Sequence, residues 1–247
     1  MGFLIALEFL TIVSLGWQRP VDPGQFSRSL PYFPWVGLIL GLVLAGTDEM
    51  LGRVLASDVV NALLVVVWIA LTGAIHLDGL MDSCDGLLAT ASPERRMQIM
   101  KDSRVGGFGV VGGVAVLLLK YAALGALSGS TRVIALILAP ALSRWALVYA
   151  MVAFPYGRSE GLGSLFKPAS GRLPLLLASL GAVSIAAVAG GWRGLSLLAL
   201  VLAGTWIVAR FALSRIPGLT GDVYGAINEL DEVLLLLAAP LLFEKRS

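Results

Sequence analysis

Residues 107–127 read GFGVVGGVAVLLLKYAALGAL, a run in which Lys120 is the single charged side chain. A bilayer core of about 30 Å is crossed by about 20 mainly apolar helical residues, so this run is typical of a membrane-spanning helix. The sequence therefore predicts an all-α, polytopic membrane bundle of about six or seven transmembrane helices. Six further apolar windows carry this prediction: residues 32–47, 59–75, 132–153, 173–190, 195–213 and 233–243.

The two ends of the chain need separate interpretation. The shortest window, 233–243, suits either a tilted span or a helix lying at the membrane interface. Residues 1–16 are apolar but contain Glu8 and lack a positive leading region, which favours a retained interfacial helix over a signal peptide. No linker divides the chain, so we expect residues 1–247 to form one membrane domain.

Composition excludes several classes of protein. Apolar residues make up 57% of the chain, charged residues 14%, and the mean hydropathy is +0.88, values that do not describe a soluble protein. One cysteine, Cys84, and one histidine, His76, exclude an intrachain disulfide and an ordinary structural zinc site. A net charge of +2 without a basic run predicts no nucleic-acid partner. The expected partner is the lipid bilayer, and a homo-oligomer is compatible with the sequence.

The distribution of Lys and Arg predicts the orientation of the bundle. With seven spans, ten cations fall on the side that receives the N-terminus and residues 77–106, 154–172 and 214–232, against five on the opposite side. Cytoplasmic loops of membrane proteins carry the excess of Lys and Arg. We therefore expect these three longer loops to face the cytoplasm across the inner membrane.

The loop expected over residues 77–106 holds the most informative motif. Asp78, Asp82 and Asp85 are spaced four and three apart, so a helix would present all three carboxylates on one face. Such a row could be a solvated helix end, but like charges beside an apolar span favour a bound cation, and Mg²⁺ or Mn²⁺ suits oxygen ligands. His76 is interpreted as a hydrogen-bonding residue at a helix interface, with catalysis as the alternative.

A second polar cluster follows at Lys101-Asp102-Ser103-Arg104, just before several glycines. Lys101 and Arg104 could neutralise phosphate oxygens, and Asp102 could complete a metal site. The alternative is a polar turn that anchors the chain at the cytoplasmic face.

Motifs typical of one protein family occur along most of the chain, at residues 9–11, 30–34, 76–86, 101–109, 139–144, 160–163 and 219–222. Together they resemble the cobalamin (5′-phosphate) synthase family, whose members are adenosylcobinamide-GDP ribazoletransferases. The resemblance implies transfer of the corrinoid phosphoryl group from adenosylcobinamide-GDP to α-ribazole or its 5′-phosphate, with release of GMP. Phosphoryl transfer of this kind requires metal ions and cations around the transferred group.

These considerations assign roles to particular residues. Asp78, Asp82, Asp85 and Asp102 are expected to hold Mg²⁺, with one aspartate left to accept the ribazole hydroxyl proton. The catalytic set is expected to comprise Asp82, Lys101 and Asp102. The residues expected to bind substrate are Arg104, Arg158, Glu160, Asp222 and Glu229.

Two other functions remain as alternatives at this stage. Residues 82–89 match the first half of the motif of CDP-alcohol phosphotransferases, but Thr90 stands where that motif has arginine. A cation transporter would use the acidic row as an ion path, yet the acidic residues cluster beside one side of the membrane. Arg144, in the middle of a predicted span, is expected to pair with an acidic group.

Overall fold

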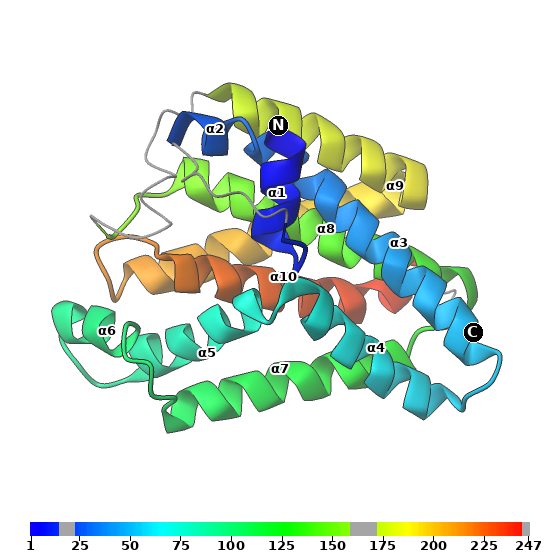
Figure 1. Ribbon diagram of the computed structural model, residues 1–247, viewed down its shortest axis with the longest axis horizontal. Coiled ribbons are helices and arrows are strands. Elements are labelled where there is room, and N and C mark those ends of the chain that lie inside the picture. The colour runs from blue at the N-terminus through cyan, green and yellow to red at the C-terminus, as the bar shows by residue number, and fades with distance from the viewer. Residues whose placement is uncertain (15–22, 159–171, 244–247) are drawn as a thin grey trace.

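The computed structural model describes residues 1–14, 23–158 and 172–243, and these residues are almost entirely helical (Figure 1). Within this part of the chain, extended pairing is limited to an isolated parallel bridge between Tyr156 and Leu219. The predicted all-α fold is confirmed.

The N-terminal elements pack together through aromatic rings. α1 (Gly2–Leu10) precedes α2 (Pro23–Ser27), the 3-10 turn η1 (Leu30–Tyr32) and α3 (Phe33–Gly52). The ring of Phe9 meets Phe26 edge-on at 5.0 Å between centroids and lies nearly parallel to Phe33 at 5.9 Å. The predicted helix over residues 1–16 is shorter in the structure, because Thr11 adopts an extended conformation after α1.

A sharp turn separates α4 (Ser57–Thr72) from α5 (Ile75–Leu88), and the two helices are bent by 92°. Gly73 ends α4 with φ of 60°, in the left-handed region where glycine has no Cβ to clash. Ala74 follows with φ of 59°, and α5 begins directly after it. The turn thus directs α5, which carries the three aspartates of the motif, across the bundle.

The predicted loop over residues 77–106 is instead mostly helical. α5 covers its first part, and α6 (Pro93–Ile99) follows, with Ser92 Oγ accepting a hydrogen bond from Arg95 N at 3.3 Å. Packing against the neighbouring helices keeps α5 helical although its glycines disfavour a helix.

The C-terminal half consists of long helices: α7 (Gly107–Gly125), α8 (Gly129–Ala153), α9 (Arg172–Leu213) and α10 (Gly221–Phe243). α9 is broken at Gly191, where φ is 58° and ψ is −142°. A Cβ on Gly194 would collide with the carbonyl of Ala186, so the chain folds back on itself there. The predicted spans 173–190 and 195–213 are the two arms of this hairpin. The predicted short element 233–243 is the end of the longer α10.

Four stretches are each long and apolar enough to cross a membrane: Gly24–Gly52, α7, α8 and α9. α4 passes the same test only together with α5, so the described residues hold four or five candidate spans. This count does not test the predicted six or seven, because it takes the two arms of α9 as one stretch and leaves out α10, which carries Glu229, Asp231 and Glu232. We treat the four stretches as the spanning segments, which leaves α5 and α10 outside them.

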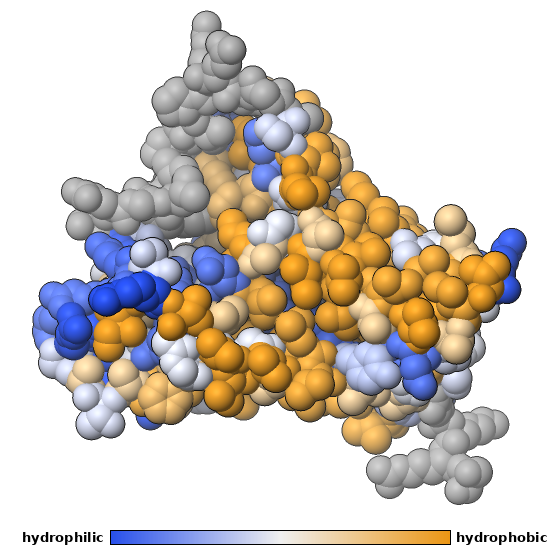
Figure 2. Space-filling model, turned by 60° about the horizontal axis from the view of Figure 1, so that its bottom comes forward, coloured by the Kyte–Doolittle hydropathy of each residue, from blue (hydrophilic) through white to orange (hydrophobic). Residues whose placement is uncertain are grey.

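The surface agrees with a membrane location. Figure 2 shows a broad apolar surface, with hydrophilic side chains gathered at the end of the molecule that carries α6. Large apolar side chains on α7 and α9, among them Leu118 and Val188, are exposed to the surroundings. An acyl-chain environment would cover such side chains.

A buried ionic network joins four helices in the core. Glu232 of α10 forms ion pairs with Lys120 of α7 and Arg144 of α8, and it accepts a hydrogen bond from Trp68 Nε1 of α4 at 3.2 Å. Lys120 also pairs with Glu229 at 2.7 Å. The predicted pairing of Arg144 with an acidic group is confirmed. Removing one partner of such a buried pair typically costs about 3–5 kcal/mol, because it leaves the other charge buried and unpaired.

Candidate functional site

The site is built where α5 crosses the start of α10. A Cβ placed on Gly79 would lie 3.0 Å from Asp222 Cα and 3.3 Å from Gly225 Cα. A Cβ on Gly225 would lie 3.1 Å from Gly79 Cα and 2.8 Å from His76 O. The two helices can approach this closely only because both positions are glycine. Their contact brings Asp78 and Asp82 of α5 beside Asp222 of α10.

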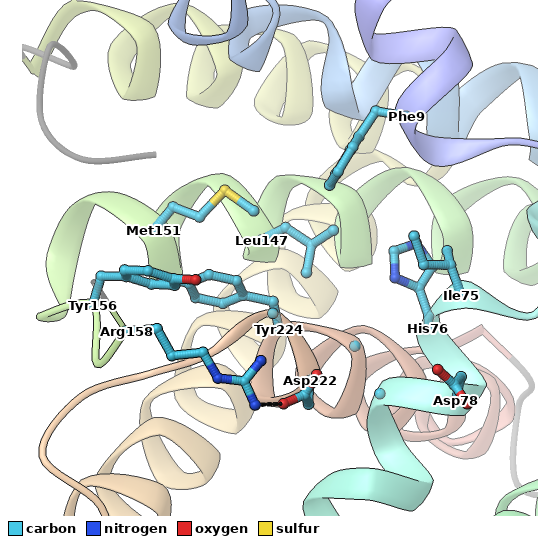
Figure 3. Close-up of a pocket in the computed structure, with 13 residues that line it drawn as sticks. Phe9, Ile75, His76, Asp78, Leu147, Met151, Tyr156, Arg158, Asp222 and Tyr224 are labelled. Atoms are coloured by element: carbon cyan, nitrogen blue, oxygen red, sulfur yellow. Dashed lines mark hydrogen bonds and ion pairs between the residues drawn. The ribbon is translucent and has the colours of Figure 1, made fainter. Parts of the chain in front are cut away.

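A cavity of about 260 Å³ opens beside this crossing (Figure 3). One part of its wall is apolar and aromatic, and another carries the charged side chains of Arg158, Asp78 and Asp222. The lining residues are Phe9, Ile75, His76, Asp78, Gly79, Leu147, Met151, Tyr156, Arg158, Gly221, Asp222, Tyr224 and Gly225.

An ion pair between Arg158 and Asp222 forms the charged part of the wall, with Nη2 and Oδ2 2.6 Å apart. The backbone sets this pair, because Gly157 N donates to Leu219 O and Leu219 N donates to Pro155 O, each at 2.8 Å. Asp222 Oδ2 also accepts a hydrogen bond from Thr220 Oγ1 at 3.1 Å. The bridge between Tyr156 and Leu219 thus holds the Arg158 guanidinium next to the Asp222 carboxylate at the start of α10.

The carboxylates of this region repel one another. Burial raises the pKa of Asp82 to about 7, and the charges of Asp78, Asp222 and Asp85 add to the effect, whereas Arg158 opposes it. Burial also raises the pKa of Asp222 despite the nearby guanidinium of Arg158. Like charges that share a site disfavour ionisation, and a bound cation would relieve this.

Asp85 lies on the same helix but has another partner. Its side chain is 9% exposed, and it accepts hydrogen bonds from Gly106 N at 2.7 Å and Gly109 N at 2.8 Å. A carboxylate at a helix N-terminus satisfies free N–H groups and interacts favourably with the helix dipole. Asp85 therefore fixes the start of α7, and both of its oxygens are engaged in doing so.

The cluster from Lys101 to Arg104 lies in the turn between α6 and α7. Asp102 accepts hydrogen bonds from Arg104 N and Nε, both at 3.0 Å, and from Nη2 at 2.7 Å. These contacts lower the pKa of Asp102 to about 2. None of the three charged side chains lines the cavity, but Met100 O accepts a hydrogen bond from Arg158 Nη2 at 3.5 Å, which puts this turn beside the charged wall.

The remaining predicted substrate-binding residues have different positions. Arg158 and Asp222 line the cavity together. Glu229 does not, because it is 5% exposed and paired with Lys120 in the core. Glu160 lies outside the described residues.

Sequence reasoning missed the aromatic wall, formed by Phe9, Tyr156 and Tyr224. These residues come from three distant segments, and no periodic pattern links them. The motif around Phe9 was noticed only through the family resemblance.

The donor set fits a magnesium ion that shares its coordination with substrate. No three His, Cys, Asp or Glu side chains of residues 1–14, 23–158 and 172–243 converge closely enough to hold a metal ion by themselves. Proteins commonly bind Mg²⁺ through one or two carboxylates together with substrate phosphates and water. Asp78 and Asp82, one helical turn apart and partly open to solvent, suit this mode.

Comparison with known proteins agrees with these features. Residues 2–240 match a protein family described as cobalamin-5-phosphate synthase. The chain belongs to this family. A protein of Desulforamulus reducens named adenosylcobinamide-GDP ribazoletransferase is 40% identical over 236 residues, which cover 94% of this chain and 93% of that protein. The resemblance predicted from the motifs is confirmed.

Relatives from other bacteria carry the same name. The one from Roseiflexus sp. strain RS-1 is 41% identical over 240 residues, covering 96% of this chain and 89% of that protein. The one from Geotalea daltonii is 38% identical over 235 residues, covering 95% of each. No solved structure matches the chain.

Proposed function

We propose that this protein transfers the adenosylcobinamide phosphoryl group from adenosylcobinamide-GDP to α-ribazole or its 5′-phosphate and releases GMP. The family and the printed names of its relatives support this reaction. One structural observation carries the location of the site: the Gly79–Gly225 contact brings Asp78 and Asp82 beside the Arg158–Asp222 pair. A diphosphate needs this combination of metal-binding carboxylates and a neighbouring cation.

Asp78 and Asp82 would hold Mg²⁺, with Mn²⁺ as a substitute, while the diphosphate supplies the remaining ligands. When bound, the metal ion would neutralise charge on the phosphate oxygens. Asp222, held by Arg158 and Thr220, would keep the guanidinium directed toward the same place. Asp85 is not included, because its oxygens hold the start of α7.

Lys101 and Arg104 would contact the diphosphate from the turn beside the cavity, and Asp102 would orient Arg104 until the substrate binds. During transfer, a ribose hydroxyl of the acceptor forms a P–O bond to the phosphorus that carries the corrinoid. The P–O bond to GMP breaks, and the hydroxyl proton passes to a carboxylate of the site. Holding both groups at one helix crossing would bring the hydroxyl within reach of the phosphorus.

The site would face the cytoplasm at the inner membrane. The Lys and Arg residues of segments 77–106 and 154–172 support this orientation, because cytoplasmic loops carry an excess of these cations. The turn that carries Lys101 and Arg104 belongs to this side.

A donor assay tests the proposal. The purified protein in nanodiscs is incubated with Mg²⁺ and either adenosylcobinamide-GDP with α-ribazole or a CDP-activated lipid with an alcohol acceptor. We expect GMP release from the first donor, its loss on chelation, and no CMP release from the second. CMP release without GMP release would overturn the assignment in favour of phospholipid synthesis.

A further inference from the structure

The size of the cavity limits what it can hold. At about 260 Å³ it lies just below the range of about 300–1,000 Å³ in which drug-sized ligands are usually enclosed. A corrinoid is far larger than this and must remain outside. A group the size of a nucleoside suits the cavity. Apart from the adenosyl group, which stays with the corrinoid, the proposed reaction supplies two of these: the guanosine of the donor and the ribazole acceptor.

The aromatic wall offers a flat surface for a planar ring. The rings of Tyr156 and Tyr224 lie 18° from parallel with centroids 6.4 Å apart, and Figure 3 shows both edge-on, one continuing the line of the other. Leu147 and Met151 lie on one side of the rings in this view, whereas Arg158 and Asp222 lie on the other. Bases stack on such aromatic surfaces without requiring hydrogen bonds to their edges.

The polar groups of the cavity distinguish the two candidate bases. Guanine presents two N–H donor groups and a carbonyl acceptor, and leaving these unpaired in a buried site is costly. On the side of the rings where Leu147 and Met151 lie, the lining is apolar apart from the tyrosine hydroxyls, whereas Arg158 and Asp222 lie on the other side. The dimethylbenzimidazole of ribazole carries methyl groups and one unsubstituted ring nitrogen. Its transfer from water to this apolar surface therefore costs little free energy.

We infer that this cavity is the acceptor subsite, in which the base of α-ribazole packs against Tyr156 and Tyr224 and its ribose faces Arg158 and Asp222. The inference rests on the proposed function. It places the attacking hydroxyl beside the carboxylates and leaves the guanosine and the corrinoid of the donor outside the cavity.

Substitution of Tyr156 tests this assignment. Tyr156→Leu removes the stacking surface and is expected to raise the KM for α-ribazole about tenfold while the KM for the donor stays within about twofold. Tyr156→Phe keeps the ring and should retain a KM near that of the original protein. Tyr121→Leu is the matched control, because Tyr121 lies on α7 and does not line the cavity.

Equilibrium binding separates a failure of this inference from a failure of the proposed function. Labelled α-ribazole is bound to the full chain in nanodiscs without donor, with GMP as competitor. We expect binding that Tyr156→Leu weakens about tenfold and that GMP does not displace. Displacement by GMP, together with a raised donor KM in Tyr156→Leu, would overturn the inference and assign the cavity to guanosine. If α-ribazole binds in this way but no GMP is released from the donor, the reaction fails and the subsite stands.

Discussion

Gly79 and Gly225 form the contact through which α5 and α10 share a site, since a methyl group on either would press into the backbone of the other. This contact places carboxylates from helices 140 residues apart in the chain beside one another. Further along α10, Glu232 forms buried ion pairs with Lys120 and Arg144. These pairs limit how far the start of α10 can move away from α5. The proposed phosphoryl transfer therefore depends on two glycines, although neither has a side chain that could bind substrate or metal.

Gly79→Ala is expected to separate the two helices. Overpacking at such a contact typically costs about 1–3 kcal/mol, and we expect a lower midpoint of thermal unfolding with at least tenfold slower GMP release. Gly46→Ala on α3 is the control, because beyond the adjacent turns of its own helix no atom of the described residues lies within 4 Å of the added methyl group. The importance of the contact would be refuted by a Gly79→Ala protein that is as active as Gly46→Ala.

The variant Asp85→Asn tests whether Asp85 has a structural role or binds the metal ion. The amide keeps one acceptor for Gly106 N or Gly109 N but loses the charge at the start of α7, so we expect a loss of stability of about 1–3 kcal/mol. The Mg²⁺ concentration for half-maximal activity should not change. A large increase in that concentration would show that Asp85 binds the metal ion after all.

The spacing of the three aspartates of α5 predicted that they share one helix. It did not predict which contacts each of them makes. Asp78, Asp82 and Asp85 share one helix as predicted, because this depends only on the 3.6-residue repeat. The partners of Asp85 lie 21 and 24 residues further along the chain, at a helix start whose position depends on packing. The sequence therefore predicted three equivalent carboxylates where the structure has two kinds.

Contacts between residues that lie far apart in the sequence could not be predicted from local patterns. Arg158 and Asp222 were identified separately, but their pairing across 64 positions depends on the bridge between Tyr156 and Leu219. Glu229 was predicted to bind substrate together with Asp222. The structure separates them, since α10 enters the core between them and Lys120 meets Glu229 there.

The pH dependence of the reaction should reflect the raised pKa of Asp82. An aspartate with a pKa of about 7 must lose its proton to bind Mg²⁺, so activity at limiting Mg²⁺ should rise through about pH 7. Saturating Mg²⁺ should move this rise to lower pH, because metal binding competes with the proton. A rise at the same pH for all Mg²⁺ concentrations would contradict the assignment.

Stability should show the opposite dependence when metal is absent. The pKa of Asp82 is higher in the folded protein than its ordinary value of 3.8, so the folded state binds the proton more tightly. This contribution to stability is complete below about pH 4 and is lost as the pH rises through about 7. Thermal unfolding in chelator should therefore occur at lower temperature at about pH 8 than at about pH 5.5. Asp82→Asn should reduce the difference, and an unchanged difference would assign it to other groups.

GMP release by Asp82→Asn across a Mg²⁺ titration tests whether this acidic face holds the metal ion that the transfer needs. The control is Asp58→Asn, which changes an exposed aspartate at the start of α4. An amide is a poor Mg²⁺ ligand, so we expect Asp82→Asn to release GMP at least a hundredfold more slowly, with no recovery at saturating Mg²⁺, while Asp58→Asn remains active. A folded Asp82→Asn protein that keeps most of its activity at saturating Mg²⁺ would contradict this assignment.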